Sequence, residues 1–295
     1  MTSERVEQAV RRLWPGGVSH MEVLGGGITN HNVKVGLDGD VYVLRIAGKD
    51  TELLGIDRRV EAEATRAAAS LGVGPEVVAF VEPEGWLVTR FIEGEIPPPE
   101  RMHEPEMLVR VAAALRAVHG GQAIPGSFDA FRVVEAYGET ATRRGAVLPA
   151  AFRWAREIAA RIEAARPELV PVPCHNDLLN ANFIDDGTAI RIVDWEYAGM
   201  GDPFFDLANV SVNHELGARE RRLLLEAYAG EMRPEHARRL ELMRFMSDFR
   251  EAMWGVVQAA VSELDFDFEA YASEHFERME RTVAEPSFRA ALDTA

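Results

Sequence analysis

The pattern of hydrophobic and polar positions changes once along the chain, near residue 100. Before that point, short runs rich in Val, Ile and aromatic residues occupy 21–24, 31–37, 41–46, 76–81 and 85–92. Glycine-rich and Asp-Gly turns separate them, which is typical of antiparallel strands joined by short connections. One helical pattern, rich in Ala and Glu, interrupts them at 58–72. The first part therefore predicts a small β lobe with one helix.

The second part of the chain is mainly helical. Helical spacing of apolar residues extends over 107–120, 151–165, 221–230 and 234–281. Only the segment 171–199 breaks this pattern, with short β-like runs around a polar stretch. Three consecutive prolines with acidic neighbours at 93–100 indicate a connector. We therefore predict an α+β fold of two lobes, with an N-terminal lobe at 1–92, a hinge at 93–100 and a larger helical lobe at 101–295.

Composition and charge narrow the classes of partner. A hydrophobic fraction of 47% with five tryptophans indicates a globular protein, and 295 residues are enough for two lobes with separate cores. The formal net charge of -16 disfavours nucleic acid or an anionic membrane as a partner. The same charge suits a small cationic substrate, although acidic surfaces also serve solubility.

Cysteine content and hydropathy bear on the compartment. Cys174 is the only cysteine, so an intrachain disulfide is impossible and we expect a reducing, cytoplasmic setting. The first residues are charged and amphipathic, unlike a signal peptide. No apolar run reaches the roughly 20 residues that span a bilayer, so we expect no integral membrane contact. Nothing in the sequence predicts the oligomeric state.

The polar stretch of 171–199 carries a pattern with a chemical meaning. Asp177 is followed five positions later by Asn182, and a short apolar run then leads to Asp194 and Glu196. Phosphoryl transfer from ATP needs a carboxylate to accept the proton of the attacking hydroxyl and oxygen ligands that hold Mg²⁺ on the phosphates. We expect Asp177, Asn182 and Asp194 to be the catalytic residues. An extended backbone would bring Glu196 to the side of Asp194.

A metal-hydrolase site is the competing interpretation of His175 and Asp177. Such a site would need further histidines nearby, and the other seven are scattered singly. We therefore expect His175 to hold the loop in shape through hydrogen bonds.

A kinase-like site also requires parts upstream, and these occur in the required order. Gly25, Gly26 and Gly27 lie between the first two predicted strands, where a loop would cover phosphates. Arg45 is a solitary charge in an apolar strand, and its guanidinium can hold phosphate oxygens bidentately. Glu61, in the following helix, is the expected partner of Arg45.

At this point the chain resembles the choline/ethanolamine kinases, within the wider aminoglycoside-phosphotransferase-like group of small-molecule kinases. The resemblance extends over about 22–280, and the stretches that carry it are GGGITNHNVKV, YVLRIAG, IDRRVEAEATRAAASLGVGPEV, HNDLLNANF, IVDWEYAGMGDPFFDLAN and SDFREAMWGVVQAAVSELDFDFEAYA. The first four suit the wider group, and the last two favour the choline-kinase branch. The resemblance implies a protein-kinase-like fold with ATP between the lobes.

The resemblance also implies roles for individual residues. Asp177 would be the catalytic base, and Asn182 and Asp194 would bind Mg²⁺. Asp206 would brace the catalytic loop. The residues expected to bind the nucleotide are Gly26, Gly27, Thr29, Asn30, Arg45, Glu61, Thr89, Phe91 and Ile92.

The amino-alcohol site is expected in the helical lobe. Ser247, Glu251, Trp254 and Gln258 would form one stripe of a helix. Aromatic faces attract quaternary ammonium groups, so Trp254 is the first candidate. The residues expected to bind the acceptor are Glu196, Tyr197, Phe249, Glu251 and Trp254.

Glu251 departs from the family pattern, because some choline kinases carry an aromatic residue there. A carboxylate can accept hydrogen bonds from a primary ammonium, whereas trimethylammonium has no N–H donor.

The leading hypothesis is an ATP-dependent phosphotransferase for choline or ethanolamine, with Mg²⁺ as cofactor. A second keeps the chemistry and changes the acceptor to an aminoglycoside, thiamine or a sugar-like alcohol. A third is an inactive nucleotide-binding scaffold, which the presence of Asp177, Asn182 and Asp194 disfavours.

Overall fold

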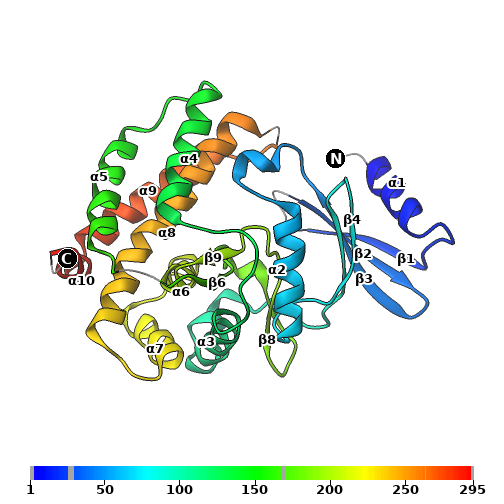
Figure 1. The fold of residues 1–295 in the computed structure, drawn as a ribbon, viewed down its shortest axis with the longest axis horizontal. Coiled ribbons are helices and arrows are strands. Elements are labelled where there is room, and N and C mark those ends of the chain that lie inside the picture. The colour runs from blue at the N-terminus through cyan, green and yellow to red at the C-terminus, as the bar shows by residue number, and fades with distance from the viewer. Residues whose placement is uncertain (1–2, 26–29, 168–169, 263, 294–295) are drawn as a thin grey trace.

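The computed structural model describes residues 3–25, 30–167, 170–262 and 264–293. It has two lobes, with an antiparallel sheet at one end and a larger bundle of helices at the other (Figure 1). This is the predicted two-lobed arrangement.

The small lobe is built on a five-stranded antiparallel sheet, in the order β1-β2-β3-β5-β4. Its strands are β1 (His20–Leu24), β2 (Asn30–Leu37), β3 (Asp40–Ala47), β4 (Val77–Val81) and β5 (Trp86–Arg90). The β2–β3 hairpin turns at Asp38 and Gly39, with φ of 52° and 91°. Two consecutive left-handed residues suit the right-handed twist of a hairpin, which explains the Asp-Gly pair.

Two helices accompany this sheet. Helix α1 (Ser3–Leu13) buries Val6, Ala9 and Val10 in a cluster with alternate residues of β2 and β3. Helix α2 (Arg58–Ser70) follows the 3-10 turn η1 (Thr51–Leu54) and is capped by Asp57, whose carboxylate accepts from two backbone N–H groups. Ala64 and Ala68 of α2 belong to the same hydrophobic cluster as the large lobe. Helix α2 therefore joins the lobes.

The large lobe surrounds one long helix, α8 (Pro234–Val261), which is buried almost continuously from Leu240 to Gln258. Its buried residues include charged ones such as Arg244, Asp248 and Glu251, so α8 carries polar groups into the centre of the lobe. The other elements are η2 (Pro99–His103), α3 (Pro105–His119), α4 (Ala130–Arg143), α5 (Ala150–Ala165), α6 (Pro203–Asn213), α7 (Ala218–Ala229), α9 (Phe268–Ala284) and α10 (Pro286–Asp293).

The polar segment of 171–199 forms two small antiparallel pairs inside this lobe. Strand β6 (Val172–Cys174) pairs with β9 (Gly199–Gly201), and β7 (Phe183–Asp185) pairs with β8 (Ile190–Ile192). The loop between β6 and β7 contains Asp177 and the short turn η3 (Asn180–Asn182). The expected strand-turn-strand excursion is confirmed.

Two helical expectations need correction. The stretch 234–281 is not one helical run, because α8 ends at Val261 and α9 begins at Phe268. Asp267 caps α9 by accepting from the Ala270 N–H at 2.9 Å, so this break uses an Asp cap instead of Gly or Pro. Helices α4 and α6 were not expected at all.

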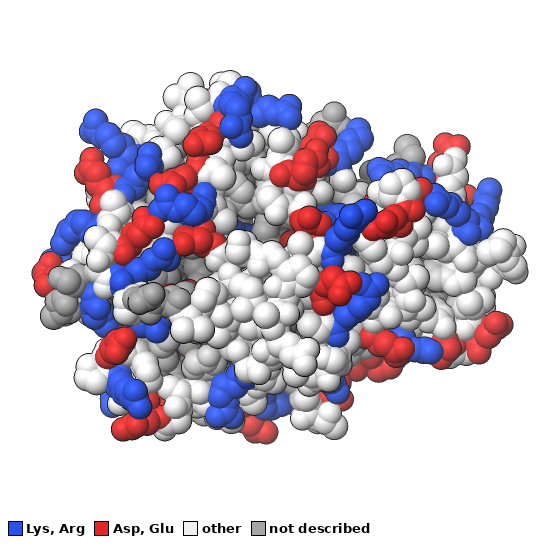
Figure 2. All heavy atoms as spheres, viewed as in Figure 1, with Lys and Arg blue, Asp and Glu red and all other residues white. Residues whose placement is uncertain are grey.

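Acidic and basic side chains alternate around the edge of the face in Figure 2, and the lower centre of that face is mostly uncharged. The net charge of -16 therefore does not collect in a single patch on this face. Among the described residues, no helix combines the length and hydropathy needed to cross a membrane.

Candidate active site

A cavity of about 520 Å³ lies between the five-stranded sheet and the β6–β8 region of the large lobe. Four of the residues predicted to bind the nucleotide lie on its wall, namely Arg45, Thr89, Phe91 and Ile92. Asn182 and Asp194 form part of the opposite wall. Gly26, Gly27 and Thr29 lie outside the described residues. Thr65, Pro75 and Leu87 also line the cavity and were not anticipated.

Asp177 and Asn182 are held together across the loop that joins β6 to β7. The Asn182 amide nitrogen donates to the Asp177 backbone oxygen at 2.8 Å and lies 3.4 Å from Asp177 Oδ2. This bond turns the Asn182 nitrogen toward Asp177 and leaves the Asn182 carbonyl oxygen for a ligand at the cavity wall.

His175 organises the loop through both of its ring nitrogens. The Asp177 backbone N–H donates to Nδ1 at 3.2 Å, so the ring proton is on Nε2, which lies 3.0 Å from the Val193 carbonyl oxygen. Burial lowers the pKa of His175 and favours this neutral form. Its contacts are those expected of a scaffold residue.

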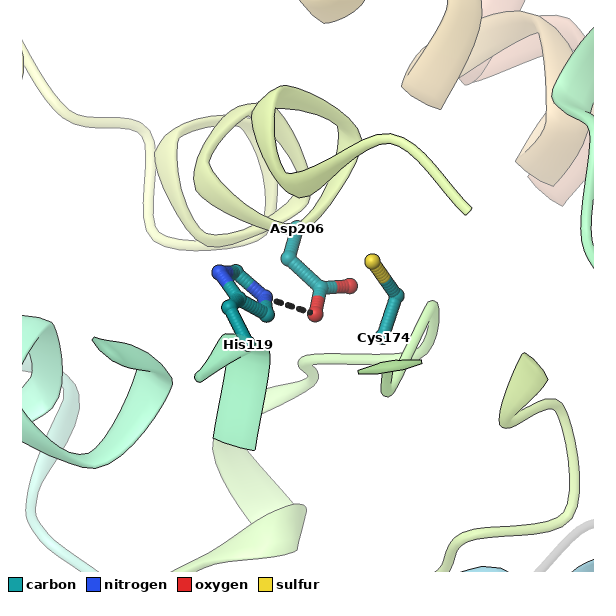
Figure 3. Close-up of side chains that lie close together, drawn as sticks. All are labelled: His119, Cys174 and Asp206. Atoms are coloured by element: carbon teal, nitrogen blue, oxygen red, sulfur yellow. Dashed lines mark hydrogen bonds and ion pairs between the residues drawn. The ribbon is translucent and has the colours of Figure 1, made fainter. Parts of the chain in front are cut away.

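Asp206 holds the other side of the loop, and its side chain lies between those of His119 and Cys174 (Figure 3). Its two carboxylate oxygens accept from the backbone N–H groups of His175 and Asn176 at 2.9 and 2.7 Å, and His119 Nε2 lies 3.0 Å from one of these oxygens.

The same three side chains resemble a possible metal site. His119, Cys174 and Asp206 offer ligand atoms within 4.8 Å of one another. Burial and the nearby Asp206 raise the pKa of the Cys174 thiol, and both Asp206 oxygens are already hydrogen-bonded. This group therefore braces the loop.

Asp194 meets Arg45 on the floor of the cavity. One Arg45 nitrogen pairs with Asp194 and another with Glu61 of α2. Asp194 itself has φ of 66°, a left-handed conformation that is uncommon for residues other than glycine, although Asn and Asp adopt it more readily than the rest. Such strain is typical of functional sites. The expected partnership of Arg45 with Glu61 is present.

Glu196 also lies near Glu61, but the backbone that leads to it differs from the expected extended one. The backbone is not extended at Asp194, so the two-residue alternation assumed from the sequence is wrong here. Arg58 Nη1 lies 2.9 Å from Glu196 Oε2 and 2.8 Å from Glu61 Oε2. The Asn30 amide donates to Glu196 at 2.8 Å. Arg58 was missed, because it is one of two adjacent arginines at a helix start.

Asp177 lies against a buried arginine that the sequence did not single out. Arg250 Nη1 is 3.1 Å from Asp177 Oδ1 and 2.6 Å from Glu251 Oε1. Burial raises the pKa of Asp177 to about 8, against the opposing charge of Arg250 and with support from Glu251, Asp194 and Glu196. The sequence carries no distinct signal for Arg250, because it is one of several charged residues along this helix and stands next to Glu251.

Inside the lobe, Trp254 lies close to Tyr197, and Glu251 contacts Arg250 and Tyr271. The Tyr271 hydroxyl donates to Glu251 Oε2 at 3.0 Å, and Trp254 Nε1 donates to the Tyr197 hydroxyl at 3.0 Å. Burial opposes ionisation of Glu251, but Arg250, His275 and Tyr271 together hold its pKa below the usual range.

Phe249 does not join this group. Its side chain is fully buried, and its ring packs against Phe152, Phe245 and Phe276. On a helix, Phe249 is about 200° from Glu251, so the two side chains point in opposite directions. The aromatic residue that does contact the Glu251 carboxylate is Tyr271.

The donor atoms at the cavity wall suit a hard divalent cation. Asn182 offers a carbonyl oxygen, and the Asp194 carboxylate, with 23% of its side chain exposed, offers a second oxygen ligand. Mg²⁺ prefers one or two carboxylates together with substrate phosphates, and these two residues fit that requirement.

Relatives cover most of the chain. The model of the Phosphotransferase enzyme family matches residues 20–242. Protein LicA of Haemophilus influenzae is 27% identical over 244 residues, covering 79% of this chain and 72% of that protein. Human ethanolamine kinase 2 is 28% identical over 302 residues, covering 91% of this chain and 77% of that protein.

A solved structure agrees with these relatives over the full length. The crystal structure of a choline/ethanolamine kinase family protein from Mesorhizobium loti has a TM-score of 0.85 and 34% sequence identity, with 100% of both chains covered.

Proposed function

Since the chain belongs to the Phosphotransferase enzyme family and, within it, to the choline/ethanolamine kinases, we propose that it phosphorylates choline or ethanolamine with ATP. Family membership makes it a small-molecule phosphotransferase. The proposal adds the nucleotide, the metal and the acceptor. The products would be ADP and the phosphomonoester of the amino alcohol.

The observation that carries the proposal is the convergence of Asp177, Asn182 and Asp194 beside one cavity. Asn182 and Asp194 are on the cavity wall, and Asp177 is hydrogen-bonded to Asn182 behind them. A hydroxyl that approached Asp177 would lie next to the end of a nucleotide in the cavity. This is the arrangement that in-line transfer requires.

Each residue has a distinct task in this proposal. Asp177 orients the acceptor hydroxyl and accepts its proton as the new P–O bond forms. Arg45, positioned by Glu61, donates to the phosphate oxygens. Asn182 and Asp194 hold Mg²⁺, whose contribution is to neutralise charge on the transferred phosphoryl group.

The acceptor would enter the acidic and aromatic group around Asp177. Glu251, Tyr197 and Trp254 lie there, and Arg250 neutralises only one of the two carboxylates when both are ionised. A cationic head group restores the charge balance, which supports an amino alcohol over a neutral sugar.

A coupled ADP-release assay tests the proposal with purified protein, MgATP and one acceptor at a time. The panel contains choline, ethanolamine, an aminoglycoside and thiamine. We expect turnover with choline or ethanolamine, and Asp177→Asn should lower kcat by about 10²–10⁴-fold. ATP should still raise the melting temperature of that variant.

Glu139→Gln is the matched control, because this carboxylate is 72% exposed on α4. It should behave as the wild type. Absence of turnover with both amino alcohols would refute the acceptor class, and full activity of Asp177→Asn would refute the assigned base.

A further inference from the structure

Arg250 lies at the centre of the group proposed to bind the acceptor. It is 1% exposed, and one of its terminal nitrogens contacts both Asp177 and Glu251. Its guanidinium carbon is 4.2 Å from the centroid of the Tyr197 ring. The protein's own cation therefore occupies the ring face that a ligand cation would use.

The other aromatic surfaces nearby are also engaged. Trp254 contacts Phe268 and Tyr271 edge to face, with ring centroids 5.8 and 5.5 Å apart. The indole N–H of Trp254 donates to the Tyr197 hydroxyl. A trimethylammonium group has no N–H donor and depends on open aromatic faces. With Arg250 in place, the Tyr197 face that it covers is closed to such a group.

The carboxylates, in contrast, keep capacity for further hydrogen bonds. Asp177 and Glu251 share one guanidinium nitrogen, so one negative charge remains when both are ionised. Each carboxylate has about four acceptor positions, and the Arg250 and Tyr271 contacts occupy only some of them. A second cation that carries N–H donors would satisfy both the charge and the hydrogen bonds.

We propose that Arg250 makes this site selective for amino alcohols whose nitrogen carries N–H donors, with ethanolamine as the simplest, and disfavours trimethylammonium acceptors. This inference rests on the proposed function and narrows its acceptor class. Arg250 acts here as a specificity-determining residue, since it occupies the aromatic face and leaves carboxylate oxygens for the ligand.

A methylation series tests the wild-type protein directly. The acceptors are ethanolamine and its N-methyl, N,N-dimethyl and N,N,N-trimethyl derivatives, the last being choline. Because each methyl group removes one donor, kcat/KM should fall along the series, by about tenfold or more from ethanolamine to choline. A value for choline equal to or above that for ethanolamine would overturn the inference.

Arg250→Met tests the residue itself, because methionine fills similar space without charge or donors. The ratio of kcat/KM for ethanolamine to that for choline should fall by about tenfold as the Tyr197 face opens. A purely structural role would lower both values equally and leave the ratio unchanged, which would refute the inference.

Arg244→Met is the matched control. Arg244 is a buried arginine of the same helix, but its partners are Glu241 and Glu285. Its loss should leave the substrate ratio at the wild-type value. If Arg250→Met fails to fold, Arg250→Lys replaces it, since lysine keeps the charge and lacks the planar group that stacks on Tyr197; the same fall in the ratio is expected.

Different results would refute the proposed function and the role of Arg250. No turnover with any member of the series refutes the proposed function. Turnover that favours choline leaves the phosphotransferase assignment intact and removes only the role of Arg250.

Discussion

Three arginines near the cavity are each shared between two carboxylates. Arg45 pairs with Glu61 and Asp194, Arg58 with Glu61 and Glu196, and Arg250 with Asp177 and Glu251. Five carboxylates therefore face three guanidinium groups, and two negative charges remain when all are ionised. Burial raises the pKa of Asp177 and of Glu196, so a proton on either one offsets part of this charge, and a ligand cation would offset it as well.

The pH dependence of stability provides a prediction at a single residue, His214. Burial, followed by the charge of His103, lowers the pKa of His214 from 6.5 to about 4. Between these values the unfolded chain binds a proton that the folded protein excludes, so the free energy of unfolding decreases as the pH falls from 6.5 to 4. The difference in pKa corresponds to about 3 kcal/mol.

The variant His214→Gln isolates this contribution, because other buried groups also titrate. Denaturant unfolding of the wild type and the variant at pH 7 and pH 4 gives the comparison. Relative to His214→Gln, the wild type should lose about 3 kcal/mol on acidification. Parallel pH profiles would show that His214 is not excluded from protonation in the folded protein.

At the scale of the element, α6 braces the β6–β7 loop, which carries the proposed base Asp177. Asp206 and Asn209 lie three residues apart on one face of α6, and together they accept the backbone N–H groups of His175, Asn176 and Leu178. Asn209 also donates to Ser247 of α8 at 3.0 Å. The loop, α6 and the helix that carries Arg250 are therefore connected by hydrogen bonds.

Replacement of Asp206 by Asn should weaken this brace. An amide keeps one acceptor oxygen and presents an NH₂ group to a backbone N–H, so at least one buried hydrogen bond is lost. We expect the free energy of unfolding to fall by about 2 kcal/mol and kcat to fall by about 10–100-fold, with a smaller change in KM for ATP. Asp265→Asn, at an exposed position, should change neither value. Wild-type kcat in Asp206→Asn would contradict the bracing role.

Some elements could be predicted from the sequence because their signals are local. Strand β2 alternates between buried and half-buried positions from Val33 to Gly36, and α2 begins at a capping Asp. Helix α6 was missed because nine of its residues are buried, and a short run without a polar face cannot be distinguished from a buried strand by periodicity. Helix α4 was also missed, although Asp129 caps its start and Gly145 follows its last turn.

The candidate site likewise contains residues that the sequence indicated and one, Arg250, that it did not. Asp177, Asn182 and Asp194 share one short segment, so their spacing alone was enough to predict them as site residues. Arg250 is adjacent to Glu251 in the sequence, which resembles an ordinary charge pair of an exposed helix. Only the packing of α8 against Tyr197 and Asp177 gives it a specific environment.

At the scale of the whole molecule, the predicted hinge at 93–100 makes close backbone contact with the large lobe. The Glu95 N–H donates to the Asp185 carbonyl oxygen at 3.1 Å, and the Asp185 N–H donates to the Glu95 carbonyl oxygen at 2.8 Å. Arg110 holds the Asp185 carboxylate through two bonds of 2.8 and 2.6 Å. The edge of the nucleotide cavity is therefore tied to strand β7 of the large lobe.

Gly94 is the position where this contact can be tested, because it also lines the cavity. An added Cβ would lie 2.5 Å from the Asp185 carbonyl oxygen and 2.7 Å from Ile184 Cγ2. Gly94→Ala should push the hinge away from β7, which would raise KM for ATP by about tenfold and reduce the thermal shift that ATP produces. Gly16→Ala is the matched control, since its Cβ would have no neighbour within 4 Å. If Gly94→Ala binds ATP as the wild type does, the hinge contact does not set the geometry of the nucleotide cavity.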